Sequence, residues 1–463
     1  KAAVPDYPIQ FVLFSAGTIP ILYLIGKRLA GPGTGLVAAA LLTVSPIHIY
    51  YAQETSMFAL LTFNAAVAMY ALVCLLQDPR STAPIGSQFQ DYARAWRSSA
   101  PVEAGDKTDF TYARQNRIQT WWRAWISRHQ WLPLESVKTD LAWIAFILFS
   151  VLTLLSHNSA VLFFAAANLF VFGLMLLQKE NKSKEQPAFQ APSLANWLIV
   201  QALILAFSFQ WVISFIKSAA SVGQKGSLSL PTLDAILQVL KSYLNPSSAI
   251  PAKIAVVIWV LYAAVICLGL FYFREKISQG LFLAAMLVIP FLLEAIVSLW
   301  RPVFSGQTLL WTTIPLFVLL ASGIAQLKYR FPIIAVVGIF CTLNIFSASD
   351  YYKFFQKEDW NSAAREVAGY AEKGDLVLFN SNIGEIPFDY YFQPYADYYQ
   401  SQVEEQGVPQ DLLSSGKSAP EMTAGDVTAL NSLLDGHDRV WLVYNDAAAT
   451  DPQGLVPLTL ASR

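Results

Sequence analysis

About ten apolar stretches of roughly 20 residues recur along the sequence, and they constrain the fold more than any other feature. Such a stretch is long enough to cross about 30 Å of hydrocarbon as an α-helix. Charged residues make up only 14% of the chain, whereas about 25% is usual in soluble domains. The stretches occupy residues 9–26, 34–50, 56–76, 140–156, 158–177, 195–216, 253–273, 279–299, 308–327 and 331–348. We therefore predict an α-helical polytopic membrane protein, with residues 1–348 as its transmembrane domain.

Cysteine usage and net charge exclude some other classes of protein. Cys74, Cys267 and Cys341 each lie inside an apolar stretch without CxxC spacing, which favours neither a disulfide framework nor a metal site. A formal net charge of -1 argues against nucleic acid as a partner.

The positions of Lys and Arg in the short loops predict which side of the membrane each loop faces, because cytoplasmic loops carry an excess of both. One alternation of the spans puts all the basic loops on one side, which we expect to be cytoplasmic. These loops contain Lys27 and Arg28, residues 77–139, residues 178–194, Arg274 with Lys276, and Lys328 with Arg330. The extracytoplasmic side then receives the polar breaks near residues 54, 157 and 301, the 217–252 loop, and everything after residue 348.

Two long polar regions stand out. Residues 77–139 are basic and rich in tryptophan, which is typical of an amphipathic segment on an anionic leaflet; a partner-docking loop is the alternative. Residues 349–463 hold 18 Asp and Glu against 7 Lys and Arg and contain no long apolar run. A helical pattern at 360–372 and strand patterns at 376–379 and 439–444 predict a small extracytoplasmic α/β domain.

An aromatic run in that domain has two readings. Its members could stack on sugar rings or pack half-buried in the domain. They are Phe388, Tyr390, Tyr391, Phe392, Tyr395, Tyr398 and Tyr399.

Polar residues at the ends of apolar stretches are candidate site residues, because ionisable groups near membrane depth are costly. Glu54, preceded by Gln53, either points into a cleft between helices or caps the next helix by accepting from backbone N–H groups near Thr55 and Met57. Either role, or both, fits the sequence.

The other two breaks carry His157 with Asn158, and Arg301. The histidine either lies at a solvent-exposed helix end or is a site residue. The arginine either snorkels to the interface or clamps a phosphate, for which a planar guanidinium is well suited. The 217–252 loop, with a helical stretch at 233–244, either closes over a lipid-linked substrate or lies at the interface. Their placement on one side favours a shared site.

Three segments, Leu22–Leu29, Gly35–Leu42 and Ser45–Glu54, resemble the second to fourth spans of polyprenyl-phosphate-sugar-dependent glycosyltransferases of the GT-C fold. These are the relatives of dolichyl-phosphate-mannose protein mannosyltransferases and lipid A aminoarabinose transferases. Leu155–Asn158 is similar to their Thr-His break, and Arg301–Phe304 to their late span with a basic entry. The tail from Trp360 to Phe379 is similar to their soluble C-terminal domain.

The resemblance implies a multi-pass protein of the bacterial plasma membrane that transfers a sugar from a polyprenyl-phosphate donor to a hydroxyl on a protein, lipid or glycan acceptor. The reaction needs a carboxylate base and cationic or metal stabilisation of the leaving phosphate. Arg301 would help to hold the phosphate, and Glu54, His157, Gln53 and Asn158 would line the cleft. The resemblance leaves a divalent cation open and implies no other cofactor.

The sequence also departs from that family. The catalytic acid of the family precedes the span at 9–26, so we expect it upstream of Lys1 and leave the catalytic residue unknown. The family's Gln-Glu pair is followed by Ala-Arg-x-Tyr, where this chain has Thr55–Phe58, and its late span opens with Arg-Tyr, where this chain has Gln307 and Thr308. These departures leave a second hypothesis, a catalytically degenerate relative that acts as a membrane scaffold or assembly subunit. A transporter is disfavoured, because the sequence shows no internal repeat.

Overall fold

The computed structural model describes residues 9–54, 56–83, 134–180, 188–221, 232–244, 250–299, 304–354, 358–411 and 421–463. The chain divides into two compact units, Lys1–Phe354 and Phe355–Arg463, each of which is described by itself. The first unit ends with the last residue of a long helix, six residues beyond the end of the last predicted apolar stretch.

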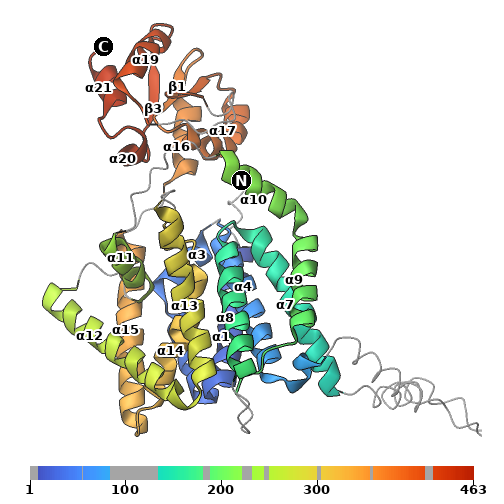
Figure 1. The fold of residues 1–463 in the computed structure, drawn as a ribbon. Helices are drawn as coiled ribbons and strands as arrows, with labels where there is room; N and C mark the ends of the chain where they lie inside the picture. Colours follow the sequence, from blue (N-terminus) through green and yellow to red (C-terminus); the bar gives the residue numbers. More distant parts are fainter. Residues whose placement is uncertain are drawn as a thin grey trace, which may run out of the picture. The chain divides into compact units, whose positions relative to one another are not determined.

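The first unit is a bundle of α-helices (Figure 1). Its helices are α1 (Ile9–Ala30), α2 (Pro32–Thr43), α3 (Pro46–Gln53), α4 (Phe58–Gln77), η1 (Pro79–Thr82), α7 (Leu134–Ser156), α8 (Ala160–Glu180), α9 (Leu194–Phe207), α10 (Phe209–Ser221), α11 (Leu233–Leu244), α12 (Ala252–Tyr272), η2 (Phe273–Glu275), α13 (Ile277–Ser298), η3 (Leu310–Thr312), α14 (Thr313–Ala325) and α15 (Arg330–Phe354).

Seven helices of the described residues are long and apolar enough to cross a membrane, and the number rises to nine if each of two bent pairs forms one span. The bent pairs are α2 with α3 and α9 with α10, and α14 is a shorter apolar helix. Every predicted apolar stretch therefore coincides with a long helix, a bent pair or α14. The prediction of a helical, multi-pass membrane protein is confirmed.

The bend between α2 and α3 measures 56° and has a local cause in the sequence. Pro46 is the first residue of α3, and a proline lacks the N–H that would continue the helix. It also drives the preceding residue out of the helical region, and Ser45 accordingly has an extended conformation, with φ -68° and ψ 118°. The short helix α3 can therefore leave the direction of α2.

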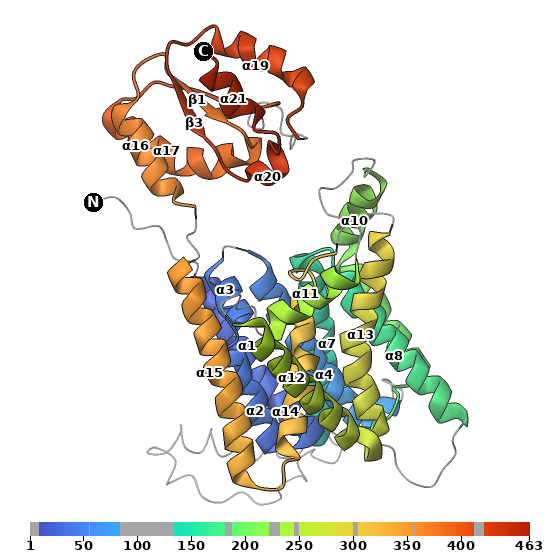
Figure 2. The same ribbon diagram turned by 90° about the vertical axis from the view of Figure 1, so that its left-hand side faces the viewer.

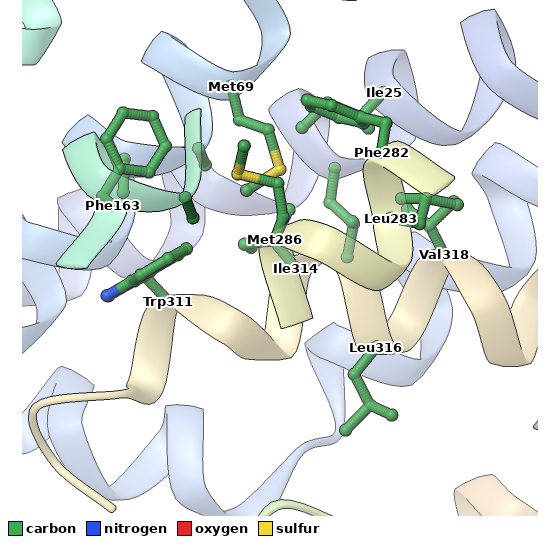
Figure 3. Packing of buried hydrophobic residues seen from close by; sticks show 14 of the residues in the cluster. Ile25, Met69, Phe163, Phe282, Leu283, Met286, Trp311, Ile314, Leu316 and Val318 are labelled. Carbon is green, nitrogen blue, oxygen red and sulfur yellow. The ribbon is translucent and has the colours of Figure 1, made fainter. Parts of the chain in front are cut away.

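The core of the bundle forms around α4 and α14. In the apolar stretch of α4, 78% of the residues are buried, against 22% in α1, α12 and α15, so these three helices turn most of their surface outward. Residues Thr313–Ile324 of α14 are buried on all sides, against α12, α2, α13 and α1. Figure 3 shows Met69 of α4 and Met286 of α13 in this core, together with Phe163 and Trp311.

Glycines set the approach of α12 to α14. A Cβ on Gly323 would lie 2.0 Å from the carbonyl oxygen of Val265, and one on Gly269 would lie 2.2 Å from that of Leu319. Membrane helices gain no hydrophobic drive from contact with one another in lipid, so close packing between small residues is a main source of their association. The two glycines thus allow α14 to lie in the centre of the bundle.

The second unit is a three-stranded parallel sheet between helices, with strand order β2-β1-β3. Its elements are α16 (Trp360–Tyr370), β1 (Leu376–Phe379), η4 (Asn382–Gly384), α17 (Glu385–Tyr399), β2 (Glu404–Gly407), η5 (Ala424–Asp426), α19 (Val427–Leu434), β3 (Val440–Val443), α20 (Ala447–Thr450) and α21 (Leu455–Ala461). Leu376 at the start of β1 pairs with Glu404 of β2 and Val440 of β3. The small α/β fold predicted from the sequence is confirmed.

Both faces of the central strand are covered, as expected for a parallel sheet. Val377 and Phe379 pack against α16 and α17, whereas Leu376 and Leu378 pack against α19 and α21. All four residues of β1 are fully buried. The continuous apolar run Leu-Val-Leu-Phe is therefore what a strand with helices on both faces requires.

The aromatic run of the second unit contains both buried and exposed rings. Phe388 and Phe392 of α17 are buried, and the ring of Phe388 lies 5.2 Å from that of Phe379. Tyr390 and Tyr398 are 71% and 78% exposed. Packing thus accounts for the phenylalanines, and these two tyrosines lie at the surface.

Glu405 in β2 is surrounded by acidic groups. Burial, followed by the nearby carboxylates of Asp389, Glu385 and Asp411, raises the pKa of Glu405 to about 7. The protonated form of this side chain is therefore favoured in the folded unit.

We predict that Gly323→Ala lowers the free energy of unfolding by about 1–3 kcal/mol, because the added methyl group collides with α12. The measurement is thermal unfolding of the purified protein in detergent. Gly338→Ala in α15 is the matched control, since a Cβ there meets no atom within 4 Å. Equal effects of the two substitutions would contradict the packing argument.

We also predict that the second unit loses stability as the pH rises from about 4.5, the ordinary value for Glu405, to about 7. The folded state binds this proton more tightly than the unfolded state, so the stabilisation is complete below the lower value and lost above the higher one. Amide exchange of β1 in the full chain, corrected for intrinsic rates, measures the effect. Glu405→Gln should flatten the profile and the exposed Glu366→Gln should not; the same profile in all three proteins would refute the assignment.

Candidate functional site

Three breaks between helices meet at one end of the bundle. The ring of Phe58, after the first break, lies 5.4 Å from that of His157 in the second. The Ser159 hydroxyl donates to the carbonyl of Thr308 in the segment before η3 (3.2 Å). Figure 2 shows α3 and α11 at the same end.

The most deeply buried acidic group at this end is Glu294, near the end of α13. The residue is 2% exposed, and its Oε1 accepts a hydrogen bond from the Thr308 hydroxyl. Its Oε2 has no hydrogen-bond partner among the described residues. A carboxylate inside a membrane helix is costly, so its presence is itself a reason to suspect a functional role.

Two tyrosines attach the segment before η3 to neighbouring helices. The Tyr243 hydroxyl, from α11, donates to the carbonyl of Gly306 (2.6 Å), and burial raises the pKa of Tyr243 well above its ordinary value. The phenol therefore stays protonated and remains a donor. Tyr51 of α3 is hydrogen-bonded to the side chain of Gln307. We refer to Tyr51, Tyr243, Glu294, Gln307 and Thr308 as the Glu294 cluster.

His157 lies beside this cluster as a neutral imidazole with an assigned tautomer. Burial lowers its pKa below the ordinary value for histidine, so the ring is uncharged at neutral pH. Its Nδ1 accepts from the Ser159 backbone N–H (3.0 Å), so the hydrogen of the neutral ring is on Nε2. The ring can therefore offer a hydrogen-bond donor at Nε2.

Glu54 lies at the end of α3, half-buried, and is hydrogen-bonded to Tyr50 one turn earlier. The helix that follows, α4, begins at Phe58 with Met57 at its N-cap, and no side-chain capping hydrogen bond forms there. The capping role of Glu54 stays a prediction. The carboxylate contributes to the electrostatic environment of Tyr51, one of the residues of the Glu294 cluster.

The remaining predicted site residues have different surroundings. Gln53 donates to the hydroxyl of Tyr352, near the end of α15. Asn158 is exposed in the turn between α7 and α8. Arg301 lies outside the described residues. The structure thus places Glu54, His157, Gln53 and Asn158 at one end of the bundle.

No group of three or more His, Cys, Asp or Glu side chains that could hold a metal ion occurs in the part of the chain that the structure describes. The structure therefore does not identify ligands for the divalent cation that the sequence left open.

Sequence reasoning missed most of the Glu294 cluster. Glu294 is the only ionisable residue in the apolar stretch at 279–299, and that isolation is the signal that could have identified it. Gln307 and Thr308 were noted only as departures from a family pattern. The structure gives both residues hydrogen bonds to other helices.

We predict that Thr308→Val lowers the free energy of unfolding by about 1–3 kcal/mol, because it leaves the buried Glu294 carboxylate without this donor. Thr62→Val is the control, since Thr62 is more deeply buried than the half-buried Thr308 and its hydroxyl donates to the carbonyl of Phe58 in its own helix. Thermal unfolding in detergent gives the comparison. Indistinguishable losses would show that the hydroxyl of Thr308 does not stabilise Glu294.

Comparisons with known proteins give one distant structural likeness. No protein-family model and no curated protein matches the sequence. The fold is similar to the crystal structure of the oligosaccharyltransferase of Archaeoglobus fulgidus in its apo form, with a TM-score of 0.31 and 12% sequence identity. The similarity covers 95% of this chain and 54% of the other, so the chain spans about half the length of that protein.

Proposed function

We propose that this chain belongs to a membrane glycosyltransferase that transfers a sugar from a polyprenyl-phosphate donor to a hydroxyl acceptor on the extracytoplasmic face. The observation that carries the proposal is the meeting of three polar breaks at one end of the bundle, with Glu54 and His157 both beside it. The segment Ser45–Glu54, which resembles that enzyme family, forms α3 and its end at this site.

The chemistry assigns different tasks to these groups. The acceptor hydroxyl attacks the anomeric carbon, the bond from that carbon to the phosphate oxygen breaks, and the phosphate leaves with the electron pair. Glu54 and the Nε2–H of His157 can hold the hydroxyls of the sugar, and Arg301 would stabilise the phosphate. The base that takes the proton of the acceptor is not assigned to a residue of this chain.

The proposed sidedness rests on where the basic residues lie. Arg28, Arg274 and Lys328 follow spans at the end of the bundle opposite to the three breaks, so the breaks would face away from the cytoplasm. Tyr352, close to the start of the second unit, contacts Gln53 at the end with the breaks. The α/β unit would therefore begin on the extracytoplasmic side.

A second function, a membrane scaffold or assembly subunit, is favoured by one observation. Gln307 and Thr308 stand where the family has Arg-Tyr, and here both are engaged in hydrogen bonds between helices. These contacts give both residues a role in holding the bundle together, which is what a scaffold requires. Co-purification with a stoichiometric partner, without turnover, would support the scaffold.

We predict that Glu54→Gln lowers sugar transfer by about tenfold or more, because the negative charge at the proposed site is lost while the size of the side chain is kept. The measurement uses full-length protein in liposomes with a labelled polyprenyl-phosphate sugar and follows the label into acceptor. Glu275→Gln is the control, since that carboxylate is 81% exposed in the turn between α12 and α13.

The outcomes separate the hypotheses. Transfer by the wild type with an unchanged rate in Glu54→Gln would remove Glu54 from the mechanism. Saturable binding of the donor without transfer would favour the scaffold, and absence of donor binding would reject the glycosyltransferase proposal.

A further inference from the structure

A pocket of about 530 Å³ lies between α4 and α7, at the opposite end of α4 from the three breaks. Phe58 begins α4 beside His157, and Gln77 ends it at the pocket; the 20 residues of this helix span about 30 Å. The pocket and the Glu294 cluster are therefore separate. The pocket is lined by residues of α1, α4, η1 and α7 and by Asp78.

The guanidinium of Arg28 is held in place by neutral groups. Its Nε lies 3.4 Å from the Tyr70 hydroxyl and its Nη1 donates to Oε1 of Gln77 (3.3 Å). The guanidinium also lies over the ring of Tyr70, at 5.6 Å from the centroid. The amide of Gln77 donates in turn to the backbone carbonyl of Arg28 (3.1 Å). Both hydrogen-bond partners are neutral, and the charge of Arg28 interacts with the carboxylate of Asp78 in the same lining.

The described residues that line the pocket include two cations and one carboxylate. Lys138, exposed near the start of α7, lines the same space as Arg28. The carboxylate among the described lining residues, Asp78, accepts hydrogen bonds from the Thr139 hydroxyl and from the backbone N–H of Arg80 (3.0 Å). Two cations against one carboxylate favour a ligand with negative charge, and a phosphate accepts several hydrogen bonds from such groups.

The rest of the lining is apolar and continues along the outside of α7. Val67 and Ala71 of α4 face Ala142 and Ala145 of α7 across the pocket. Beyond them, Leu141, Ile144 and Leu148 are 58%, 59% and 50% exposed, at a spacing that keeps them on one side of the helix. A free phosphate would leave this apolar surface unused, whereas an acyl chain would cover it.

We propose that the pocket between α4 and α7 binds the phosphate headgroup of an anionic phospholipid, with an acyl chain along Leu141, Ile144 and Leu148. Arg28 and Lys138 contact the headgroup at the membrane surface, where basic pockets between helices bind anionic lipids. Such a lipid holds α1, α4 and α7 together at the end of the bundle opposite to the proposed transfer site. The lipid-binding pocket does not depend on the proposed sugar transfer.

Cys74 provides a direct test, because it lies in the pocket whereas Cys267 is exposed on α12. The full chain in neutral detergent is treated with N-ethylmaleimide, and modification of each cysteine is followed by peptide mass spectrometry. Phosphatidylglycerol should slow modification of Cys74 and leave that of Cys267 unchanged. Phosphatidylcholine should protect Cys74 much less.

Lys138→Gln should raise the phosphatidylglycerol concentration for half-protection about fivefold, the change expected for one surface cation. Lys276→Gln, an exposed lysine beside Tyr272 in the turn before α13, is the matched control and should leave it unchanged. Arg28→Gln, which also removes the contacts to Tyr70 and Gln77, should weaken protection further.

Several results would overturn the proposal. Equal protection by phosphatidylcholine would show that the charge of the headgroup is irrelevant. Equal protection by inorganic phosphate would assign the pocket to a free anion, and a shift in Lys138→Gln no larger than in Lys276→Gln would remove the lysine from the site.

Discussion

At hydrocarbon depth every backbone amide and carbonyl needs a partner inside the protein, and this requirement decides where the chain can leave helical geometry. The breaks near residues 54, 157 and 305 meet the requirement by lying against one another. The Ser159 hydroxyl bonds the Thr308 carbonyl, and Tyr243 bonds that of Gly306. A set of irregular segments thus forms a polar surface at one end of an otherwise helical bundle. The candidate site lies where these irregular segments meet. Its polar side chains are held by the same hydrogen bonds that give the backbone carbonyls of the breaks their partners.

The position of the grouping depends in turn on close packing in the centre. Gly269 and Gly323 let α12 approach α14, and the buried α14 carries the segment before η3 into the middle of the bundle. Pro46 bends α3 away from α2, which places Tyr51 against Gln307. The buried packing of small residues and the polar contacts of the site are therefore parts of one arrangement.

The fold could be predicted from the sequence because the two patterns that specify it are local. Apolar length gives the spans, and the switch from apolar stretches to the pattern Leu376–Phe379 gives the α/β unit. The residues of the candidate site could be predicted only in part. Glu54 and His157 interrupt apolar stretches and are visible one at a time, but Tyr243 and Glu294 become neighbours only when α11 and α13 pack against the same segment. Contacts between residues dozens of positions apart carry no local signal. The functional reading of Glu54, His157, Gln53, Asn158 and Arg301 stays a prediction.

The length of α14 has a consequence for the segment that precedes it. With 13 residues it measures about 20 Å along its axis, whereas the hydrocarbon layer is about 30 Å thick. The difference is taken up by η3 and the turns before it, which are rich in hydroxyl and amide groups. The Ser159 and Tyr243 hydroxyls therefore supply carbonyls of this segment with the hydrogen bonds that a longer helix would have formed within itself.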